Sequence, residues 1–279
     1  VTVDSNGVVT GMGRIDSSVI TVTDKILGSS YSFTVRVAQS ADTEITVPMI
    51  VSGYGHTLAL RADGTVWAWG DNTYGQLGDG TYGTSNVDKF VPRQVRIGQN
   101  ESNTKLLTNI KYVAAGANSS AAIDQDGLLY VWGNNDNGQL GVDGKIVAYP
   151  TLVEALKDNP ATPNADETIL VSAVELSESH TIIIDALTKR AYTWGKNDHN
   201  QLGYQQSILN NGKPMTSPST ENYAKEAHLV TRDKGDLNFL EVASGKNHSV
   251  GIVIPASEAE TATQGTVYAL SLIHISEPT

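Results

Sequence analysis

One motif limits what this chain can fold into: an aromatic strand that ends in Trp-Gly and is followed by a Gly-rich turn. It occurs three times, as VWAWGDNTYGQLG at Val66–Gly78, VWGNNDNGQLG at Val131–Gly141 and YTWGKNDHNQLG at Tyr192–Gly203. The Gly after the last aromatic residue falls at positions 70, 133 and 195. A period of about sixty residues indicates a supersecondary unit that is repeated in space.

A second motif precedes each Trp-Gly strand and alternates between apolar and polar residues, as a half-buried strand does. Its four copies are Val51–Leu60, Ala114–Ile123, Glu175–Ile184 and Ala243–Ile252. Asp63-Gly64 and Asp126-Gly127 then provide dipeptides typical of tight hairpins. The third copy has Ala186–Lys189 instead, which predicts a longer turn. Each repeat is therefore predicted to be a hairpin, a turn and a variable stretch.

A single sheet of this kind cannot cover both of its faces, but radial stacking against neighbouring sheets can, and that arrangement is a β-propeller. The predicted fold is all-β: an incomplete β-propeller of three blades and part of a fourth, with an N-terminal β-sandwich fragment. The constant positions of the repeat are predicted to have structural roles. They are Gly53, His56, Trp69, Gly70, Gly75, Gly78, Gly116, Trp132, Gly133, Gly138, Gly141, His180, Trp194, Gly195, Gly203, Gly245 and His248.

The combined pattern GxxHTxxL…DGxVxxWGxNxxGQLG resembles the repeat of the regulator of chromosome condensation family. The resemblance covers Val51 to Ala269 and includes the opening of a fourth unit. It implies a propeller of about seven blades, of which this chain holds some. The sequence departs from the pattern at Ser119, which stands in place of His, at Asn200, which stands in place of Gly, and at 186–189, which lacks Asp-Gly.

The first 37 residues have a different pattern. Ser18–Thr23 and Tyr31–Val37 alternate as strands, and Asn6-Gly7 is a hairpin signal. This segment resembles the second half of a bacterial immunoglobulin-like domain of group 2, a kind found in surface adhesins. The last ten residues, LSLIHISEPT, resemble a translated sequencing adapter.

The predicted domain boundaries follow from these patterns. Between the motifs, Phe90–Ile97 is predicted to be an outer strand and Ala224–Asp233 a helical turn. Because such a set of blades cannot close, two blade faces are expected to lie open. The predicted segments are 1–37 (half of an immunoglobulin-like domain), 38–50 (linker), 51–269 (propeller repeats, at about 51–112, 113–173, 174–241 and a truncated 242–269) and 270–279 (a non-native tail).

Composition excludes several classes of function. Thirty acidic residues against nineteen basic ones give a net charge of −11, which disfavours binding to nucleic acid. No apolar stretch is long enough to span a membrane. The chain has no Cys, which excludes disulfides, thiolate metal sites and Cys nucleophiles.

No catalytic or metal-binding pattern stands out. His56, His180 and His248 occupy equivalent positions and could form a ring of metal ligands, but Ser119 interrupts the set, so buried histidines bonded to backbone carbonyls are favoured. Asp71-Asn72 and Asn134–Gly138 lack the Glu that completes a calcium loop. No nucleophile elbow, phosphate loop or HExxH motif occurs. The chain is predicted to be no enzyme and to bind no cofactor and no metal.

Three classes of function stay open. The first is a non-catalytic binding or adhesion module of a bacterial surface or secreted protein, which recognises a protein or a glycan through loops on one propeller face. It implies an extracellular or cell-surface location. The alternative that the resemblance implies is guanine-nucleotide exchange on a small GTPase. The third is a propeller enzyme, a lyase or hydrolase, with its site in the central channel.

Overall fold

The computed structural model divides the chain into two compact units, residues 1–43 and 44–279. The described residues of the first unit form two antiparallel strand pairs, β1 (Thr2–Val3) with β2 (Val9–Thr10) and β3 (Ser18–Thr23) with β4 (Ser30–Val35). The turn residues Asn6-Gly7 lie outside the described residues. The structure describes 2–3, 9–10, 18–23, 30–35, 45–83, 89–98, 105–156, 168–199, 201–203, 223–232, 235–254 and 265–270.

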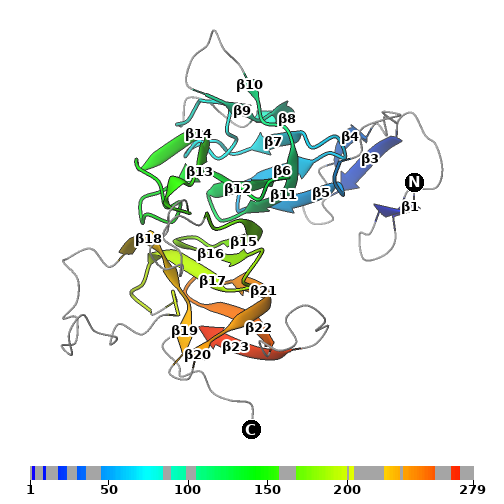
Figure 1. Ribbon diagram of the computed structural model, residues 1–279. Coiled ribbons are helices and arrows are strands. Elements are labelled where there is room, and N and C mark those ends of the chain that lie inside the picture. Colours follow the sequence, from blue (N-terminus) through cyan, green and yellow to red (C-terminus); the bar gives the residue numbers. More distant parts are fainter. Residues whose placement is uncertain are drawn as a thin grey trace. The chain divides into compact units, whose positions relative to one another are not determined.

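The described residues of the second unit form four antiparallel sheets of three or four strands, here called blades 1 to 4, in which consecutive strands pair. The first strands of neighbouring blades contact one another, and the blades follow one another in sequence order (Figure 1). Blade 1 is β5 (Met49–Ser52), β6 (His56–Leu60), β7 (Val66–Gly70) and β8 (Lys89–Gln94); blade 2 is β11 (Ile110–Ala115), β12 (Ser119–Asp124), β13 (Leu129–Asn134) and β14 (Ile146–Leu152); blade 3 is β15 (Val171–Leu176), β16 (His180–Asp185), β17 (Ala191–Lys196) and β18 (Tyr223–Leu229); blade 4 is β21 (Asn238–Ser244), β22 (Ser249–Ile254) and β23 (Thr266–Leu270).

Short elements connect the blades. They are β9 (Arg96–Ile97) with β10 (Lys105–Leu106), the 3₁₀ turn η1 (Glu154–Leu156), and β19 (Thr231–Arg232) with β20 (Gly235–Asp236). The strand expected at Phe90–Ile97 is divided between β8 and β9.

The hairpins inside the blades close as their turn residues predict. Gly64 and Gly127 adopt φ of 74° and 88°, a region that glycine enters without steric cost. Asp63 supports its turn by accepting bonds from the backbone N–H and the hydroxyl of Thr65. The third hairpin has the longer turn that was expected, and Lys189 takes the positive φ, at 59°.

The helical turn predicted at Ala224–Asp233 is wrong. Tyr223–Leu229 forms β18, which pairs antiparallel with β17, from Tyr192↔Leu229 to Lys196↔Tyr223. The outer edge of β17 would otherwise carry unpaired backbone groups, and pairing with a fourth strand satisfies them. The need to complete the sheet therefore outweighs local helix propensity.

The core lies between the blades. On the second strand of each blade, alternate residues face the preceding and the following blade. Leu58 and Leu60 of blade 1 face blade 2 and are buried, as are Ala122 of blade 2, facing blade 1, and Ile183 of blade 3, facing blade 2. Blades therefore stabilise one another by covering each other's apolar faces.

Candidate functional site

The Gly of each Trp-Gly pair is required by the backbone. Gly70, Gly133 and Gly195 adopt φ of 105°, 108° and 103°, a region that residues with a Cβ rarely enter. A Cβ at Gly133 would also lie 2.7 Å from Ser119 Cα on the neighbouring strand. These positions fix the exit of the chain from the third strand into the Gln-Leu-Gly turn.

The Trp of blade 2 and the Trp of blade 3 each pack against the Gln-Leu-Gly turn of the preceding blade. Trp132 is fully buried, and its indole Nε1 donates to the Gln76 carbonyl oxygen at 2.8 Å. Gly78 adopts a φ of 64°, and a Cβ there would lie 2.9 Å from the same Nε1. Trp194 repeats this packing on Gly141. The turn of one blade and the Trp of the next thus form one contact, made between residues far apart in sequence.

A buried polar link joins blades 1 and 2. Ser120 Oγ donates to the Gln76 carbonyl oxygen at 2.8 Å and lies 2.9 Å from His56 Nε2. Because the hydroxyl uses its only proton on the carbonyl, His56 donates from Nε2. Burial lowers the pKa of His56 to about 4, although the nearby Asp71 carboxylate acts in the opposite direction.

The same link joins blades 3 and 4. Ser249 Oγ donates to the Gln201 carbonyl oxygen at 3.2 Å and lies 2.8 Å from His180 Nε2. The other ring nitrogen, Nδ1, lies 2.7 Å from Ser177 Oγ. Burial, and to a smaller degree the neighbouring His248, lowers the pKa of His180 to about 4. The bonds run to serine hydroxyls, where the sequence had suggested backbone carbonyls.

The link between blades 2 and 3 lacks the histidine. Ser119 takes its place, and Thr181 Oγ1 donates to the Gln139 carbonyl oxygen at 2.5 Å. A hydroxyl from the residue directly after the His or Ser position of the repeat, on the second strand of the blade, is therefore present in every described contact between blades. Its signal in the sequence is a Thr or Ser directly after the His or Ser of each repeat: Thr57, Ser120, Thr181 and Ser249.

Of the other repeat positions, Trp69 lies in β7 and is half-buried, and the rest lie in turns. His248 is exposed, so the expectation of a buried histidine is wrong at this position. Gly53, Gly116 and Gly245 follow the first strand of their blades, where a Cβ would collide with, respectively, the Gly116 carbonyl oxygen, Ser177 O and the His248 ring. Gly75, Gly138 and Gly203 adopt positive φ in the turns after the Trp-Gly strands.

The Asp and Asn residues considered for calcium organise turns. Asn72 Oδ1 accepts from Leu77 N at 3.0 Å, and Asn135 Oδ1 accepts from Leu140 N at 2.8 Å. Asp71 Oδ1 accepts from the backbone N–H of Thr73 at 2.9 Å. Their oxygens are thus used within the turns. Among the described residues, no group of three or more acidic or His side chains could hold a metal ion.

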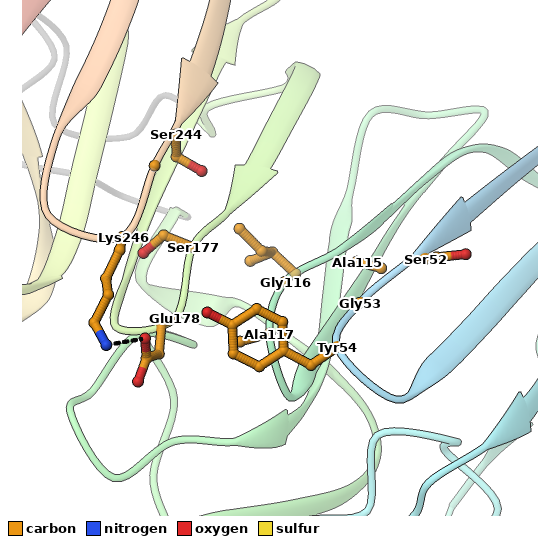
Figure 2. A pocket seen from close by; sticks show the side chains of 12 residues that line it. Ser52, Gly53, Tyr54, Ala115, Gly116, Ala117, Ser177, Glu178, Ser244 and Lys246 are labelled. Atoms are coloured by element: carbon orange, nitrogen blue, oxygen red, sulfur yellow. Dashed lines mark ion pairs between the residues drawn. The ribbon is translucent and has the colours of Figure 1, made fainter. Parts of the chain in front are cut away.

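Four equivalent turns, one from each blade, converge around an opening of about 230 Å³ that we call the axial opening (Figure 2). Each turn connects the first strand of its blade to the second. Tyr54 N donates to the Ala117 carbonyl oxygen at 3.0 Å and joins the first two turns. The lining residues are Ser52–Tyr54, Ala115–Ala117, Leu176–Glu178 and Ser244–Lys246.

The side chains at the axial opening differ from blade to blade. Lys246 Nζ lies 3.0 Å from Glu178 Oε2, so an exposed ion pair joins the turns of blades 3 and 4. Hydrogen bonding to Glu178 raises the pKa of Lys246. Tyr54 is 73% exposed and reaches toward this pair (Figure 2). An exposed aromatic ring beside a charged pair is a surface suited to binding another macromolecule.

The first strands of blades 3 and 4 carry two acidic residues, Glu175 and Glu241. Burial, followed by the neighbouring Glu241, raises the pKa of Glu175. Burial, followed by Glu175 and Glu241, raises the pKa of Tyr112. The three side chains come from blades 2, 3 and 4 and interact electrostatically across the blades. These three described side chains form no arrangement of nucleophile and base with an oxyanion-stabilising group.

Four sheets stacked in sequence order, with their first strands innermost and the set left open, define an incomplete β-propeller. The sequence profile of the regulator of chromosome condensation (RCC1) repeat matches residues 63–123, 126–184 and 190–252, and a second profile of this repeat matches 110–139. The matches cover more than half of the chain. The chain belongs to the RCC1 repeat family.

Known proteins agree with this assignment. The chain is 27% identical over 238 residues to protein pim1 of Schizosaccharomyces pombe, covering 82% of this chain and 39% of pim1. It is 26% identical over 215 residues to the guanine nucleotide exchange factor SRM1 of Saccharomyces cerevisiae, covering 75% of this chain and 40% of SRM1. The structure of yeast RCC1 (Prp20) bound to Kap60 superposes with a TM-score of 0.58 and 23% identity, over 85% of this chain and 45% of that one. The chain thus spans less than half of each.

The predicted extracellular or bacterial cell-surface location is wrong. The relatives are nuclear or cytosolic proteins of eukaryotes. The prediction depended on the likeness of residues 1–37 to an adhesin-type domain, and the RCC1 profiles match only residues further along the chain. Within the part of the chain that the structure describes, no helix has the length and apolar character needed to cross a bilayer.

Proposed function

We propose that this chain is a non-catalytic protein-binding module whose partner contacts the axial opening and the turns around it. The observation that carries the proposal is the convergence of four structurally equivalent turns, from four blades, that carry different side chains. Rigid strands hold these turns in place, and variable residues on a rigid scaffold are where binding is usually found.

Three residues supply the chemistry of the proposed interface. Tyr54 offers an exposed aromatic surface, and Lys246 with Glu178 offers a charged pair beside it. Aromatic residues are enriched among the side chains that contribute most to protein–protein binding. The similarity to relatives that act as exchange factors or binding proteins also favours a protein as the partner. The glycan partner that the sequence left open has no such support.

The second candidate is guanine-nucleotide exchange on a small GTPase. It is supported by the similarity to SRM1, which is named as a guanine nucleotide exchange factor. On this hypothesis the same axial opening contacts the GTPase, and the chain accelerates loss of bound GDP without forming a covalent bond to it. Because the chain covers 40% of SRM1, the activity of the whole relative is a proposal for this chain.

The two candidates are distinguished by measuring both binding and release. Biosensor binding to a panel of eukaryotic small GTPases is combined with stopped-flow release of fluorescent GDP. Accelerated release supports exchange, and binding without release supports a module that only binds. Flat traces and no binding across the panel contradict the exchange hypothesis.

A photo-crosslinking amino acid tests the site independently of the partner's identity. Placed at Tyr54, it should form a discrete protein adduct in a eukaryotic cell extract. Placed at Tyr82, which is 55% exposed and lies outside the axial opening, it should not. For an identified partner, Tyr54→Ala should weaken binding about 30-fold, corresponding to about 2 kcal/mol, and Tyr82→Ala is the matched control. Equal adducts from both positions would contradict the proposed site.

A further inference from the structure

The ion pair at the axial opening places a positive group against a carboxylate. Lys246 Nζ lies 3.0 Å from Glu178 Oε2, and the two side chains are 66% and 38% exposed. Tyr54 comes from a third turn, reaches toward the pair and interacts electrostatically with Lys246 (Figure 2). With its own lysine, the chain thus shows that this part of the opening holds a cation.

Negative charge exceeds positive charge among the side chains near this pair. Glu175 and Glu241 lie on β15 and β21, the strands that lead into the lining turns. Burial, followed by the charge of Glu241, raises the pKa of Glu175, so the two carboxylates disfavour one another. Together with Glu178 they outnumber the single charge of Lys246. A second positive group at the opening would reduce this repulsion.

Ser244 adds an unused hydrogen-bonding group to the same opening. Its Oγ is buried, and it has no hydrogen-bond partner among the residues that the structure describes. A buried polar atom without a partner costs stability unless water or a ligand satisfies it. The opening therefore offers a carboxylate, a hydroxyl and an exposed aromatic ring. These groups match a guanidinium, whose several N–H donors reach more than one acceptor and whose plane stacks on aromatic rings.

We propose that the axial opening takes an arginine side chain of the protein partner, and that Glu178 exchanges Lys246 for it. This inference rests on the proposed function, because it names the group that the partner inserts. The exchange is feasible because an exposed ion pair contributes little to stability. Lys246 is then an internal competitor, which occupies Glu178 until the partner binds.

The size of the opening favours a side chain over a free small molecule. Its volume is about 230 Å³, whereas pockets for small molecules measure roughly 300 to 1,000 Å³. Tyr54, at its rim, is exposed and can stack on the guanidinium while the rest of the partner lies over the turns. The partner's backbone then contacts the surface around the opening, and one basic side chain enters it.

The test titrates the whole chain with capped arginine (N-acetyl-arginine N-methylamide) and follows backbone amide resonances by NMR. Capped citrulline has nearly the same shape but no charge, and it is the matched probe. Capped arginine should shift the resonances of Glu178, Ser244 and Lys246 with a Kd in the millimolar range, and capped citrulline should leave them in place. Equal shifts from both probes, or none from either, would overturn the proposal.

Two substitutions separate the anchor from the competitor. Glu178→Gln removes the charge that holds the guanidinium and should abolish the shifts. Lys246→Met removes the competitor and should tighten binding about 2- to 5-fold, the range expected for an exposed ion pair. Glu154→Gln and Lys105→Met make the same changes at exposed residues outside the opening and should have no effect. Unchanged or weaker binding in the Lys246 variant would contradict its role as a competitor.

The outcomes also distinguish this inference from the proposed function. If a crosslinker at Tyr54 captures a discrete partner although capped arginine does not bind, the opening binds protein through other groups and only the arginine inference fails. If capped arginine binds as expected but Tyr54 yields no adduct, the protein-binding proposal fails while the cation site stands.

Discussion

His180 Nε2 lies 2.8 Å from Ser249 Oγ, although 69 residues separate the two in sequence. The bond crosses from blade 3 to blade 4 and repeats the one between His56 and Ser120. A buried polar pair of this kind fixes the position of one blade against the next, because misaligned blades would leave both groups unpaired. The properties of these contacts lead to four predictions.

Stability should fall with acidification. Burial lowers the pKa of His56 and His180 from the ordinary histidine value of 6.5 to about 4. Between these two values the unfolded chain binds more protons than the folded one, so the free energy of unfolding decreases as pH falls from 6.5 to 4. The loss is at most about 3 kcal/mol for each histidine, since one pKa unit corresponds to about 1.4 kcal/mol.

Urea denaturation at pH 7.5, 6.5, 5.5 and 4.5 measures this effect. His180→Asn should lower stability at neutral pH and flatten the pH dependence. His199→Asn removes a partly exposed histidine and serves as the control. Parallel pH profiles of the unmodified chain and the His180 variant would rule out the buried histidine as a source of the dependence.

Removing a buried indole should cost more than removing a half-buried one. Trp132 is fully buried on the turn of blade 1, so Trp132→Ala should lower the free energy of unfolding by about 3 to 5 kcal/mol. Trp69→Ala changes the equivalent residue of blade 1, which has no preceding blade over it, and should cost less. The difference in urea midpoints tests whether the contact between blades, and not the residue type, stabilises the fold.

A methyl group at Gly78 should be poorly tolerated. Its φ of 64° disfavours a side chain, and a Cβ would lie 2.8 Å from Val95 Cγ1 and 2.9 Å from Trp132 Nε1. Gly83→Ala is the matched control, because Gly83 also has a positive φ, 97°, but no atom lies within 4 Å of its Cβ position. Backbone strain alone costs about 1 to 2 kcal/mol, and Gly78→Ala should exceed that amount. Similar thermal melts for both variants would disprove the close contact.

Deleting the hydroxyl between blades 1 and 2 should leave a buried ring nitrogen unpaired. Ser120→Ala removes the partner of His56 Nε2, whereas the Gln76 carbonyl oxygen keeps the bond from Trp132 Nε1. An unsatisfied buried group costs about 1 to 3 kcal/mol, and the loss should shrink if His56 is changed at the same time. Ser52→Ala, at an exposed serine of β5, should have no measurable effect. Additive losses in the double variant would show that the two residues do not interact.

The blades could be predicted from the sequence because their determinants recur. Trp-Gly at 69–70, 132–133 and 194–195 marks the third strand of blades 1 to 3, and alternation in Glu175–Ile184 predicts a second strand. The partners of these residues could not be predicted, since every contact between blades joins different repeats. Ser120 is an ordinary polar strand residue until the fold places it against His56 and Gln76.

The axial opening was not predicted for a related reason. Tyr54, Glu178 and Lys246 stand at positions where the repeats differ, so no periodic signal selects them. Only the folded chain brings these three turns together. The helical turn expected at Ala224–Asp233 failed because its local sequence contains no information about the open edge of β17 that β18 completes.

Trp132 and Trp194 each pack on the turn of the preceding blade, so local unfolding of one blade also removes contacts from its neighbour. Within the described part of the chain, blades 2 and 3 contact a blade on both sides, whereas blades 1 and 4 contact one each. Amide protons of β12 and β16 should therefore exchange with deuterium more slowly than those of β6 and β22, in a gradient that runs from the middle of the array toward its ends.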